Sequence, residues 1–395
     1  MILSFNFARI PNIIFGAGRL NELYDIIPQF GKNVLFVIGE TSLKKSGKWD
    51  EITSIIDKKS FNYFLLSISK EPSPLIIDEA VTKFRKKNIE LVVGIGGGSV
   101  TDAGKAISAM IPKEDSIKNY LEGVGNKIHD GEKIPYIAIP TTSGTGSEAT
   151  KNAVISEIGP EGFKKSLRHD NLIPNIALID PELMISCPPS ISAACGMDAF
   201  TQLLEAYVSP KGSPMTDTLA LSGMKYMNKN LLYACSSGAS NIEVRTAMAY
   251  GSLMSGITLA NAGLGIVHGL ASAIGGLYDI PHGVICGTLL AEATKINIKK
   301  LQEQDSSGKE GLKKHADIGA LLSEDKTEEI GKTDENCSKL VNILDRWTQE
   351  LKIERLGKYG IKVEDIDIII EKTGLKSNPV KLEKEDIKNI LINRL

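Results

Sequence analysis

The chain has 395 residues, of which 42% are hydrophobic and 24% are charged, and its formal net charge is −2. This composition is typical of a globular protein, and the length exceeds what one hydrophobic core usually serves, so we expect two domains. The charge balance leaves no basic surplus for nucleic acid or an anionic membrane surface.

The ends and the cysteines give no sign of export or of a membrane. The N-terminal stretch "MILSFNFARIPNIIFGAG" lacks the charged and apolar regions of a signal peptide, and no apolar run reaches the roughly 20 residues of a spanning helix. The five cysteines are scattered and odd in number, as expected for reduced thiols. The sequence therefore predicts a cytoplasmic protein.

Short runs rich in valine and isoleucine alternate with helical stretches in the first half of the chain. Strands are predicted at 33–39, 89–98, 134–142 and 175–180, and a helix is predicted at 73–88. Continuous apolar strands that alternate with helices indicate a parallel sheet covered on both faces.

The second half has helical spacing and no predicted strand. We therefore expect an α/β domain at 1–185, followed by an all-helical domain at 186–395. The polar segment 302–337 is expected to form solvated helices and loops. The predicted helices are 190–209, 214–235, 241–263, 264–278 and 284–300.

A glycine-rich turn in "VVGIGGGSVTDAGKAI" (92–107) joins a predicted strand to a predicted helix. Glycines let backbone N–H groups approach a ligand, and the helix N-terminus adds positive potential, so the turn suits a pyrophosphate. It is neither a GxGxxG fingerprint nor a P-loop, and a tight turn with Asp102 as a first-turn charge and Lys105 on the surface is the alternative. The residues predicted here to bind a cofactor are Gly96, Gly97, Gly98, Ser99 and Asp102.

A second turn, "PTTSGTGSEAT" (140–150), also follows a predicted strand and is rich in hydroxyl groups. We expect Thr141 and Thr142 near the phosphates or the nicotinamide, and Ser147 among the cofactor contacts. The alternative is a serine- and threonine-rich helix cap. Two such turns at successive strand ends favour the nucleotide interpretation.

Five histidines occur in the chain, and two of them are candidates for a site. His129 and His315 lie in polar stretches and are expected on the surface. His268 and His282 flank the small, apolar stretch "HGLASAIGGLYDIPH". A lone histidine in such a place is more often structural than a ligand, so a second set of donors is needed.

Asp198 and Gln202 supply that set in "GMDAFTQLLEAY" (196–207). Residues four apart lie on one face of a helix, so this pair and two histidines from elsewhere can meet around a cation. Glutamine is an unusual ligand, and a polar residue on a helix face is the alternative.

The combination resembles the iron-containing (group III) alcohol dehydrogenases, in the superfamily that also holds glycerol dehydrogenase and dehydroquinate synthase. The resemblance extends from about residue 10 to residue 300, and the remainder matches only loosely. The stretches that carry it are "GGGSVTDAGKAI", "PTTSGTGSEAT", "NIALIDPELM", "PPSISAACGMDAFTQLLEAYVS" and "HGLASAIGGLYDIPHGV".

The resemblance implies a dehydroquinate synthase-like fold, with the active site between the dinucleotide domain and the helical domain. By motif position, the family's metal-binding aspartate corresponds to Asp198, and two of its metal-binding histidines correspond to His268 and His282. The remaining ligand of the family is a histidine, and Gln202 stands there. A further histidine near the substrate in many relatives is Ser272 here.

The chemistry implied is the interconversion of a primary alcohol and an aldehyde with a nicotinamide cofactor. A divalent metal would act as a Lewis acid, and Fe²⁺ is expected first, with Mn²⁺, Mg²⁺ or Zn²⁺ as alternatives. We predict that Gln202 ligates the metal through its side-chain oxygen, a harder and weaker donor than imidazole. A small alcohol or aldehyde is the expected substrate, and a homodimer is the expected assembly.

Two further residues bear on the cofactor. Glu40 follows the strand predicted at 33–39 and favours NAD, because an acid there binds the ribose hydroxyls and repels a 2′-phosphate. Gly39 and Ser42 resemble NADP-using relatives, so NADP stays open. Lys164 occupies the position of a lysine that contacts the cofactor in relatives, and a surface lysine in a charged hairpin is the alternative.

Three competing functions remain. A polyol dehydrogenase of the glycerol type and a lyase belong to the same superfamily, although the "GGGS" turn argues against the polyol branch. A catalytically silent nucleotide-binding relative is suggested by Gln202 and Ser272. The retained Asp198, His268 and His282 argue against it.

Overall fold

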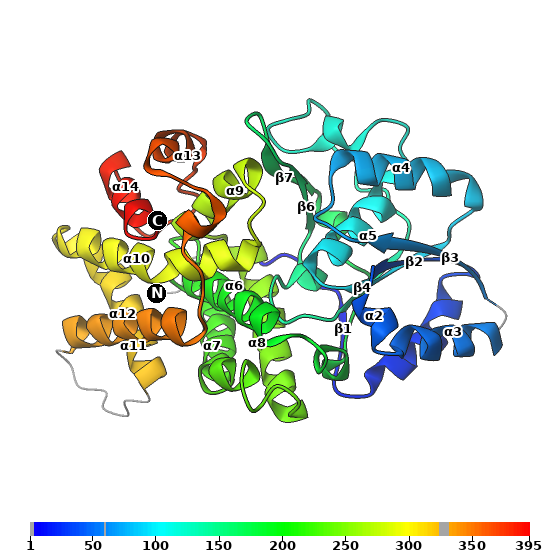
Figure 1. Cartoon of the computed structure of the whole chain (residues 1–395), viewed down its shortest axis with the longest axis horizontal. Helices are drawn as coiled ribbons and strands as arrows, with labels where there is room; N and C mark the ends of the chain where they lie inside the picture. The colour runs from blue at the N-terminus through cyan, green and yellow to red at the C-terminus, as the bar shows by residue number, and fades with distance from the viewer. Residues whose placement is uncertain (1–3, 59–60, 324–331) are drawn as a thin grey trace.

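The computed structural model describes residues 4–58, 61–323 and 332–395, and it consists of an α/β half and a helical half (Figure 1). In the described residues, the last strand is β8 (Ile176–Ile179), and the first long helix is α6 (Pro189–Val208). The predicted division at 185/186 falls between these two elements and stays a prediction. Residues 324–331 of the polar segment predicted as solvated helices and loops lie outside the described residues.

The α/β half is built on six parallel strands in the order β1-β8-β5-β4-β2-β3. The four predicted strands are confirmed, with slightly different ends. The two edge strands of the sheet were not predicted, because one is short and the other has half-exposed residues along its length. The strands of this sheet are β1 (Asn12–Phe15), β2 (Asn33–Gly39), β3 (Asn62–Ile68), β4 (Leu91–Gly96), β5 (Tyr136–Pro140) and β8 (Ile176–Ile179).

Strand β2 shows that both faces of the sheet are buried. Its alternate residues Leu35 and Val37 join one apolar cluster, while Val34 and Phe36 join another, and all four are fully buried. The predicted two-sided cover is therefore confirmed. Helices α4 (Pro74–Phe84) and α5 (Gly98–Met110) cover the first face, and α1 (Leu23–Ile26) and α3 (Lys48–Lys58) cover the second; α2 (Ser42–Lys45) follows β2.

The strand order changes direction between β2 and β4. From β2 the chain moves outward to β3, then returns to place β4 on the other side of β2. Open parallel sheets bind ligands outside the carboxyl ends of the strands at such a switch point. Glu40 directly follows β2, and Gly97 directly follows β4, so both predicted cofactor segments lie at this point.

A two-stranded hairpin, β6 (Asn152–Glu157) and β7 (Phe163–Arg168), reaches from the first half to the second. The backbone N–H of Gly159 donates to the carbonyl of Gly276, at 3.1 Å, in helix α9. Figure 1 shows this hairpin beside α9. The sequence predicted no strands here, because the hairpin has few apolar residues.

The helical half is arranged around α6, whose residues from Gly196 to Val208 are all buried. A helix that is apolar on every side is typical of a domain centre. The five predicted helices are confirmed. The helices of this half are α6 (Pro189–Val208), α7 (Pro214–Ala234), α8 (Ile242–Ala262), α9 (Ile266–Leu277), α10 (His282–Gln302), α11 (Lys309–Ser323), α12 (Thr333–Glu350), α13 (Ile366–Lys372) and α14 (Lys384–Ile392).

No single described helix is long and apolar enough to cross a membrane. Only α8 and α9 together meet that condition, and the break between them bends the pair by 98°.

Two histidines expected on the surface are buried, so that expectation is wrong. His129 is 2% exposed and its Nε2 contacts the carbonyl oxygen of Ala109 at 3.1 Å. His315 is fully buried in α11, with Nδ1 at 2.7 Å from the carbonyl of Gly311. Each ring points inward although its sequence neighbours are polar, an orientation that composition does not reveal.

Candidate active site

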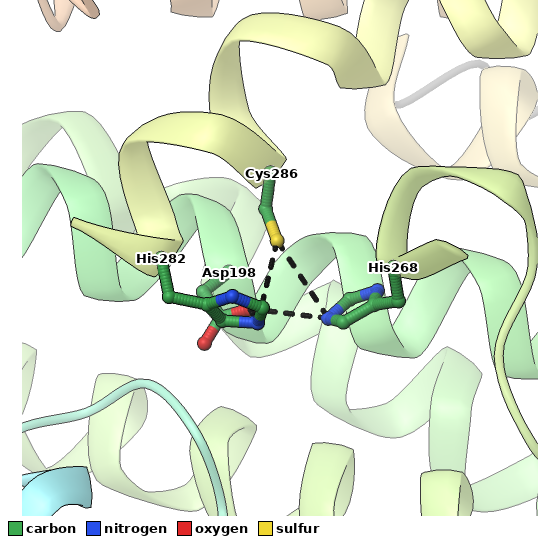
Figure 2. Close-up of side chains that lie close together, drawn as sticks. All are labelled: Asp198, His268, His282 and Cys286. Atoms are coloured by element: carbon green, nitrogen blue, oxygen red, sulfur yellow. Dashed lines mark hydrogen bonds and ion pairs between the residues drawn. The ribbon is translucent and has the colours of Figure 1, made fainter. Parts of the chain in front are cut away.

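Four side chains from three helices of the second half converge (Figure 2). Asp198 comes from α6, His268 from α9, and His282 and Cys286 from α10, and their ligand atoms all lie within 4.8 Å of one another. Asp198 Oδ1 lies 3.3 Å from His268 Nε2 and 3.7 Å from His282 Nε2. Carboxylate, imidazole and thiol are the ligand types of divalent transition metals, so this cluster fits a metal ion.

The cluster is closed on most sides and open at one. The side chains of Asp198 and His268 are 3% and 5% exposed, whereas that of His282 is 23% exposed. In addition, the Nδ1 atom of His282 is buried without a hydrogen-bond partner among the described residues. His282 is therefore the most exposed side chain of this cluster.

Glu205, two turns after Asp198 on α6, fixes the orientation of His268. Its Oε2 lies 2.6 Å from His268 Nδ1, and its Oε1 accepts a hydrogen bond from the backbone N–H of Val267 at 2.7 Å. A carboxylate on the far nitrogen of a ligating imidazole sets the tautomer and directs the other nitrogen to the metal. Here that other nitrogen, Nε2, faces Asp198.

Without a metal, two of the four groups, His268 and Cys286, hold a proton that a metal must displace. Burial lowers the pKa of His282 to about 3 and raises the pKa of the Cys286 thiol to about 11. Burial also opposes the charged form of His268, but Cys286, Asp198 and Glu205 together hold its pKa well above the usual value. Metal binding needs neutral imidazoles and a thiolate, so it is linked to pH.

Gln202 lies one turn after Asp198 and is 3% exposed. Its Oε1 accepts a hydrogen bond from Ser255 Oγ on α8, at 2.7 Å. Since a carbonyl oxygen has two lone pairs, this contact leaves the predicted ligation untested, and it stays a prediction.

Ser272 lies one turn after His268 on α9 and contacts the backbone. Its Oγ donates to the carbonyl of His268 at 2.8 Å. The ammonium of Lys376, from the segment before α14, donates to the same carbonyl at 3.0 Å and lies 3.3 Å from Ser272 Oγ. Burial lowers the pKa of Lys376.

The glycine-rich turn joins β4 to α5 as predicted. Part of the turn is closely packed against neighbouring side chains, and part of it is half-buried. A Cβ on Gly96 would lie 2.5 Å from a methyl group of Val100, and one on Gly98 would lie 2.6 Å from a methyl group of Thr145. Gly97, the N-cap, has more room, and no side chain caps this N-terminus. Gly97, Gly98 and Ser99 are half-buried, which fits backbone contact with an anion.

Two predicted cofactor residues, Asp102 and Ser147, belong to a buried network. Ser147 Oγ donates to Asp102 Oδ1 at 2.5 Å, and the ammonium of Lys105 donates to the backbone carbonyls of Ser147 and Asn152, each at 2.7 Å. Lys105 is fully buried, so its alternative placement on the surface is wrong, and burial lowers its pKa to about 8. This network holds α5 to the second turn, and any cofactor contact by Asp102 or Ser147 stays a prediction.

The second turn connects the two halves. The backbone N–H of Thr141 donates to the carbonyl of Gly96 at 2.9 Å, and Thr142 is half-buried beside Gly97. On its other side, a Cβ added to Gly144 would lie 2.9 Å from the Cβ of Cys195 on α6. The candidate phosphate turns are thus packed directly against the helix that carries Asp198.

Lys164 is ion-paired, since its ammonium contacts Glu71 Oε1 at 2.5 Å and Oε2 at 2.7 Å. Its side chain is 8% exposed and packs on α9, where a Cβ added to Gly275 would lie 3.1 Å from Lys164 Cδ. The surface alternative for Lys164 is therefore wrong. The pair is near enough to the metal cluster to affect the pKa of His282, which Lys164 lowers and Glu71 raises.

Cys286 and Glu205 are not among the site residues that the sequence predicts. Each had a spacing signal: Cys286 lies four residues after His282, and Glu205 lies seven after Asp198, on the same helix faces. Ser255 and Lys376 had no such spacing signal, because their segments come close to the site only in the tertiary fold.

Comparison with known proteins agrees with this geometry. The family described as iron-containing alcohol dehydrogenase matches residues 11–181, and the C-terminal region of the same family matches residues 192–395. The chain belongs to the iron-containing alcohol dehydrogenase family. It is therefore an NAD(P)-dependent oxidoreductase that acts on alcohols.

Several relatives match over almost their whole length. The NAD-dependent methanol dehydrogenase of Bacillus methanolicus is 30% identical over 396 residues, which cover 99% of this chain and 100% of that protein. The NADPH-dependent butanol dehydrogenase of Clostridium saccharobutylicum is 29% identical, covering 96% of this chain and 95% of that protein. The crystal structure of an archaeal alcohol dehydrogenase from a Red Sea brine pool superposes with a TM-score of 0.89, at 26% identity, over 100% of this chain and 99% of that one.

Proposed function

We propose that the protein interconverts a small primary alcohol and its aldehyde with NAD(H), using a divalent metal held by Asp198, His268 and His282. The observation that carries this proposal is the convergence of these side chains from α6, α9 and α10. This convergence argues against a catalytically silent relative, because a protein that only binds nucleotides has no need of it.

The cofactor is expected at the switch point of the sheet. The N-terminus of α5 and the half-buried Gly97 and Ser99 would bind the pyrophosphate, and Thr141 and Thr142 would lie beside it. One relative is named for NAD and another for NADPH, so the preference must come from this chain's own residues. The exposed Glu40 favours NAD by repelling a 2′-phosphate.

When bound, a divalent metal supplies Lewis acidity toward the alcohol or aldehyde oxygen. The protein's own residues orient the metal ligands and exclude water from them. Glu205 orients His268, and the burial of Asp198 excludes water from one side of the cluster. Ser272 has no basic group, so the proton of the alcohol would leave through water or the cofactor ribose.

Several relatives are named for methanol, 1,3-propanediol and butanol, which supports a short alcohol, while one is named for long-chain alcohols. Short primary alcohols and their aldehydes are therefore the first compounds to test. A glycerol-type polyol dehydrogenase is the second candidate within the family's chemistry. The homodimer and the cytoplasmic location predicted from the sequence remain predictions.

A binding titration and an aldehyde screen test this proposal. NADH and NADPH are titrated against the protein's fluorescence, and formaldehyde through butanal, 3-hydroxypropanal and dihydroxyacetone are offered with each cofactor. We expect NADH to bind and at least one short aldehyde to be reduced. Failure of both cofactors to bind would refute the proposal, and reduction of dihydroxyacetone alone would favour the polyol alternative.

A further inference from the structure

Cys286 lies inside the metal cluster, one helical turn after His282 on α10. Its sulfur is 3.7 Å from His268 Nε2 and 3.7 Å from His282 Nε2, and the residue is fully buried. Figure 2 shows the sulfur pointing toward the two imidazoles and Asp198 rather than away from them. A residue four positions after a ligand on the same helix has the reach to share its metal.

The spacing of the donor atoms matches a tetrahedral site. Bonds of about 2.0–2.1 Å to nitrogen or oxygen and about 2.3 Å to sulfur place tetrahedral donors about 3.3–3.4 Å apart, or about 3.5–3.6 Å apart where one is sulfur. The measured separations are 3.3 Å for Asp198–His268, 3.7 Å for Asp198–His282, and 3.7 Å from the sulfur to each imidazole. These four separations are within a few tenths of an ångström of a tetrahedral shell, and all the donor atoms lie within 4.8 Å of one another.

Gln202, the ligand predicted from the sequence, is hydrogen-bonded to a serine of α8. Its Oε1 is 2.7 Å from Ser255 Oγ, and that hydroxyl is also 2.7 Å from the carbonyl of Ser252. A hydroxyl donates one proton, so the amide could equally present its nitrogen to Ser255. In either orientation one arm of the amide is held by α8, whereas the sulfur of Cys286 has no other partner than the two histidines and Asp198 among the described residues.

We propose that the Cys286 thiolate, in place of the Gln202 amide, is the fourth protein ligand of the metal, and that the site prefers Zn²⁺ to Fe²⁺. This inference rests on the metal site of the proposed function. A thiolate is a soft donor, and an Asp–His–His–Cys set is suited to zinc. Two anionic ligands also neutralise a divalent cation, which favours its burial among side chains as enclosed as Asp198 and His268.

The thiolate also reverses the metal preference argued from Gln202 alone. An amide oxygen is a hard donor and would favour Fe²⁺, Mn²⁺ or Mg²⁺. A site with the Cys286 thiolate can then be distinguished from a site with the Gln202 amide by the metal that it retains and by the spectrum of that metal, without any measurement of catalysis.

The test uses chelator-stripped full-length protein and metal ions alone, with no cofactor or substrate. Zn²⁺ affinity is measured by competition with a chromophoric chelator, Fe²⁺ is measured anaerobically, and Co²⁺ is added as a spectroscopic probe of thiolate ligation. The variants are Cys286→Ser and Gln202→Ala. Cys337→Ser is the matched control, because Cys337 is also buried but lies on α12 outside the cluster.

We expect one Zn²⁺ per chain, tighter binding of Zn²⁺ than of Fe²⁺, and a near-ultraviolet thiolate-to-cobalt band in the wild type. Cys286→Ser should abolish the band and weaken Zn²⁺ binding by more than about a hundredfold, since loss of a group that only supports a ligand costs about 10–100-fold. Gln202→Ala and Cys337→Ser should keep the band and stay within a few-fold of the wild-type affinity. Thermal melts check the fold, and Cys286→Ala replaces the serine variant if that one melts early.

Three results would overturn the inference: a wild-type cobalt spectrum without the thiolate band, a Cys286→Ser variant that retains wild-type Zn²⁺ affinity, or a larger loss in Gln202→Ala than in Cys286→Ser. In each of these cases a metal still binds, so the proposed function survives. A wild-type chain that binds no divalent metal would remove the proposed function together with this inference.

Discussion

A single residue, Glu40, is predicted to set the preference between the two nicotinamide cofactors. It is exposed at the carboxyl end of β2, and its backbone N–H donates to the carbonyl of Ile68 at 3.2 Å. Juxtaposed like charges cost several kcal/mol, so we expect Glu40→Gly to lower the NADH-over-NADPH ratio of kcat/KM by at least about tenfold. Glu40→Gln, which removes only the charge, should do the same. Unchanged ratios in both variants would show that Glu40 faces away from the ribose.

Ser272, at a position where the resemblance leads us to expect a histidine, is a second residue with a testable role. Its hydroxyl is bonded to the backbone of His268 and cannot act as a general base near neutral pH. Ser272→Ala should therefore leave kcat within a few-fold of wild type, measured at saturating cofactor. A fall of about a hundredfold, which is the scale of a lost proton-transfer group, would mean that the hydroxyl is part of the proton path.

Residue types and spacing predicted the metal core but not its fourth member. Asp198, His268 and His282 could be found because their motifs match a family. Cys286 was missed although it lies four residues after His282, because that spacing alone does not separate a ligand from a buried thiol. Its meaning depends on the approach of α9 to α10, which is a property of the tertiary fold.

At the scale of elements, α10 and α6 make a close contact at Gly283. A Cβ added to Gly283, next to His282, would lie 2.2 Å from the backbone oxygen of Ala194 on α6. Gly283→Ala should force the two helices apart, lowering the free energy of unfolding by about 1–3 kcal/mol, the usual cost of overpacking, and reducing bound metal.

Denaturant unfolding and metal analysis check this expectation. Gly374→Ala is the control, because a Cβ there meets nothing within 4 Å. Equal stability and equal metal content in the two variants would show that the spacing of α6 and α10 does not set the site.

Most of the elements could also be predicted, and the exceptions have physical reasons. The buried strands and the long helices have clear periodicity. The hairpin β6–β7 does not, because it is stabilised by packing against α9 and by the Lys164–Glu71 pair, which are contacts distant in the sequence.

At the scale of the whole molecule, the buried His315 links stability to pH. Burial lowers its pKa from 6.5 to about 4. The unfolded chain therefore protonates His315 below pH 6.5, whereas the folded chain protonates it only below about pH 4. The contribution of the neutral ring to stability is complete above pH 6.5 and is lost as the pH falls. Between pH 8 and pH 5 the loss should be about 2 kcal/mol.

Urea unfolding of wild type and His315→Leu at both pH values isolates this contribution. The stability difference between the two proteins should change by that amount in favour of the variant at low pH. If the stability difference between the two proteins does not change with pH, the pKa of His315 is the same in the folded and unfolded chains, as expected for a ring in contact with water.

The two halves are joined where the function requires it. The second turn contacts the glycine-rich turn on one side, and α6 and α8 on the other, so cofactor and metal segments form one packed unit. Alternation of strands and helices was enough to predict the two halves. The junction itself depends on close approaches such as Gly146 to Gly256, which no local pattern reveals.

Reduction of a short aldehyde by NADH, followed while metal is returned to chelator-stripped protein, tests the central claim most directly. We predict that the stripped protein binds NADH but does not reduce the aldehyde, and that activity rises linearly to a plateau at one metal ion per chain. Asp198→Ala should bind NADH and stay inactive at every metal concentration. Aldehyde reduction by the stripped protein at the full rate, or a plateau that Asp198→Ala also reaches, would contradict the account.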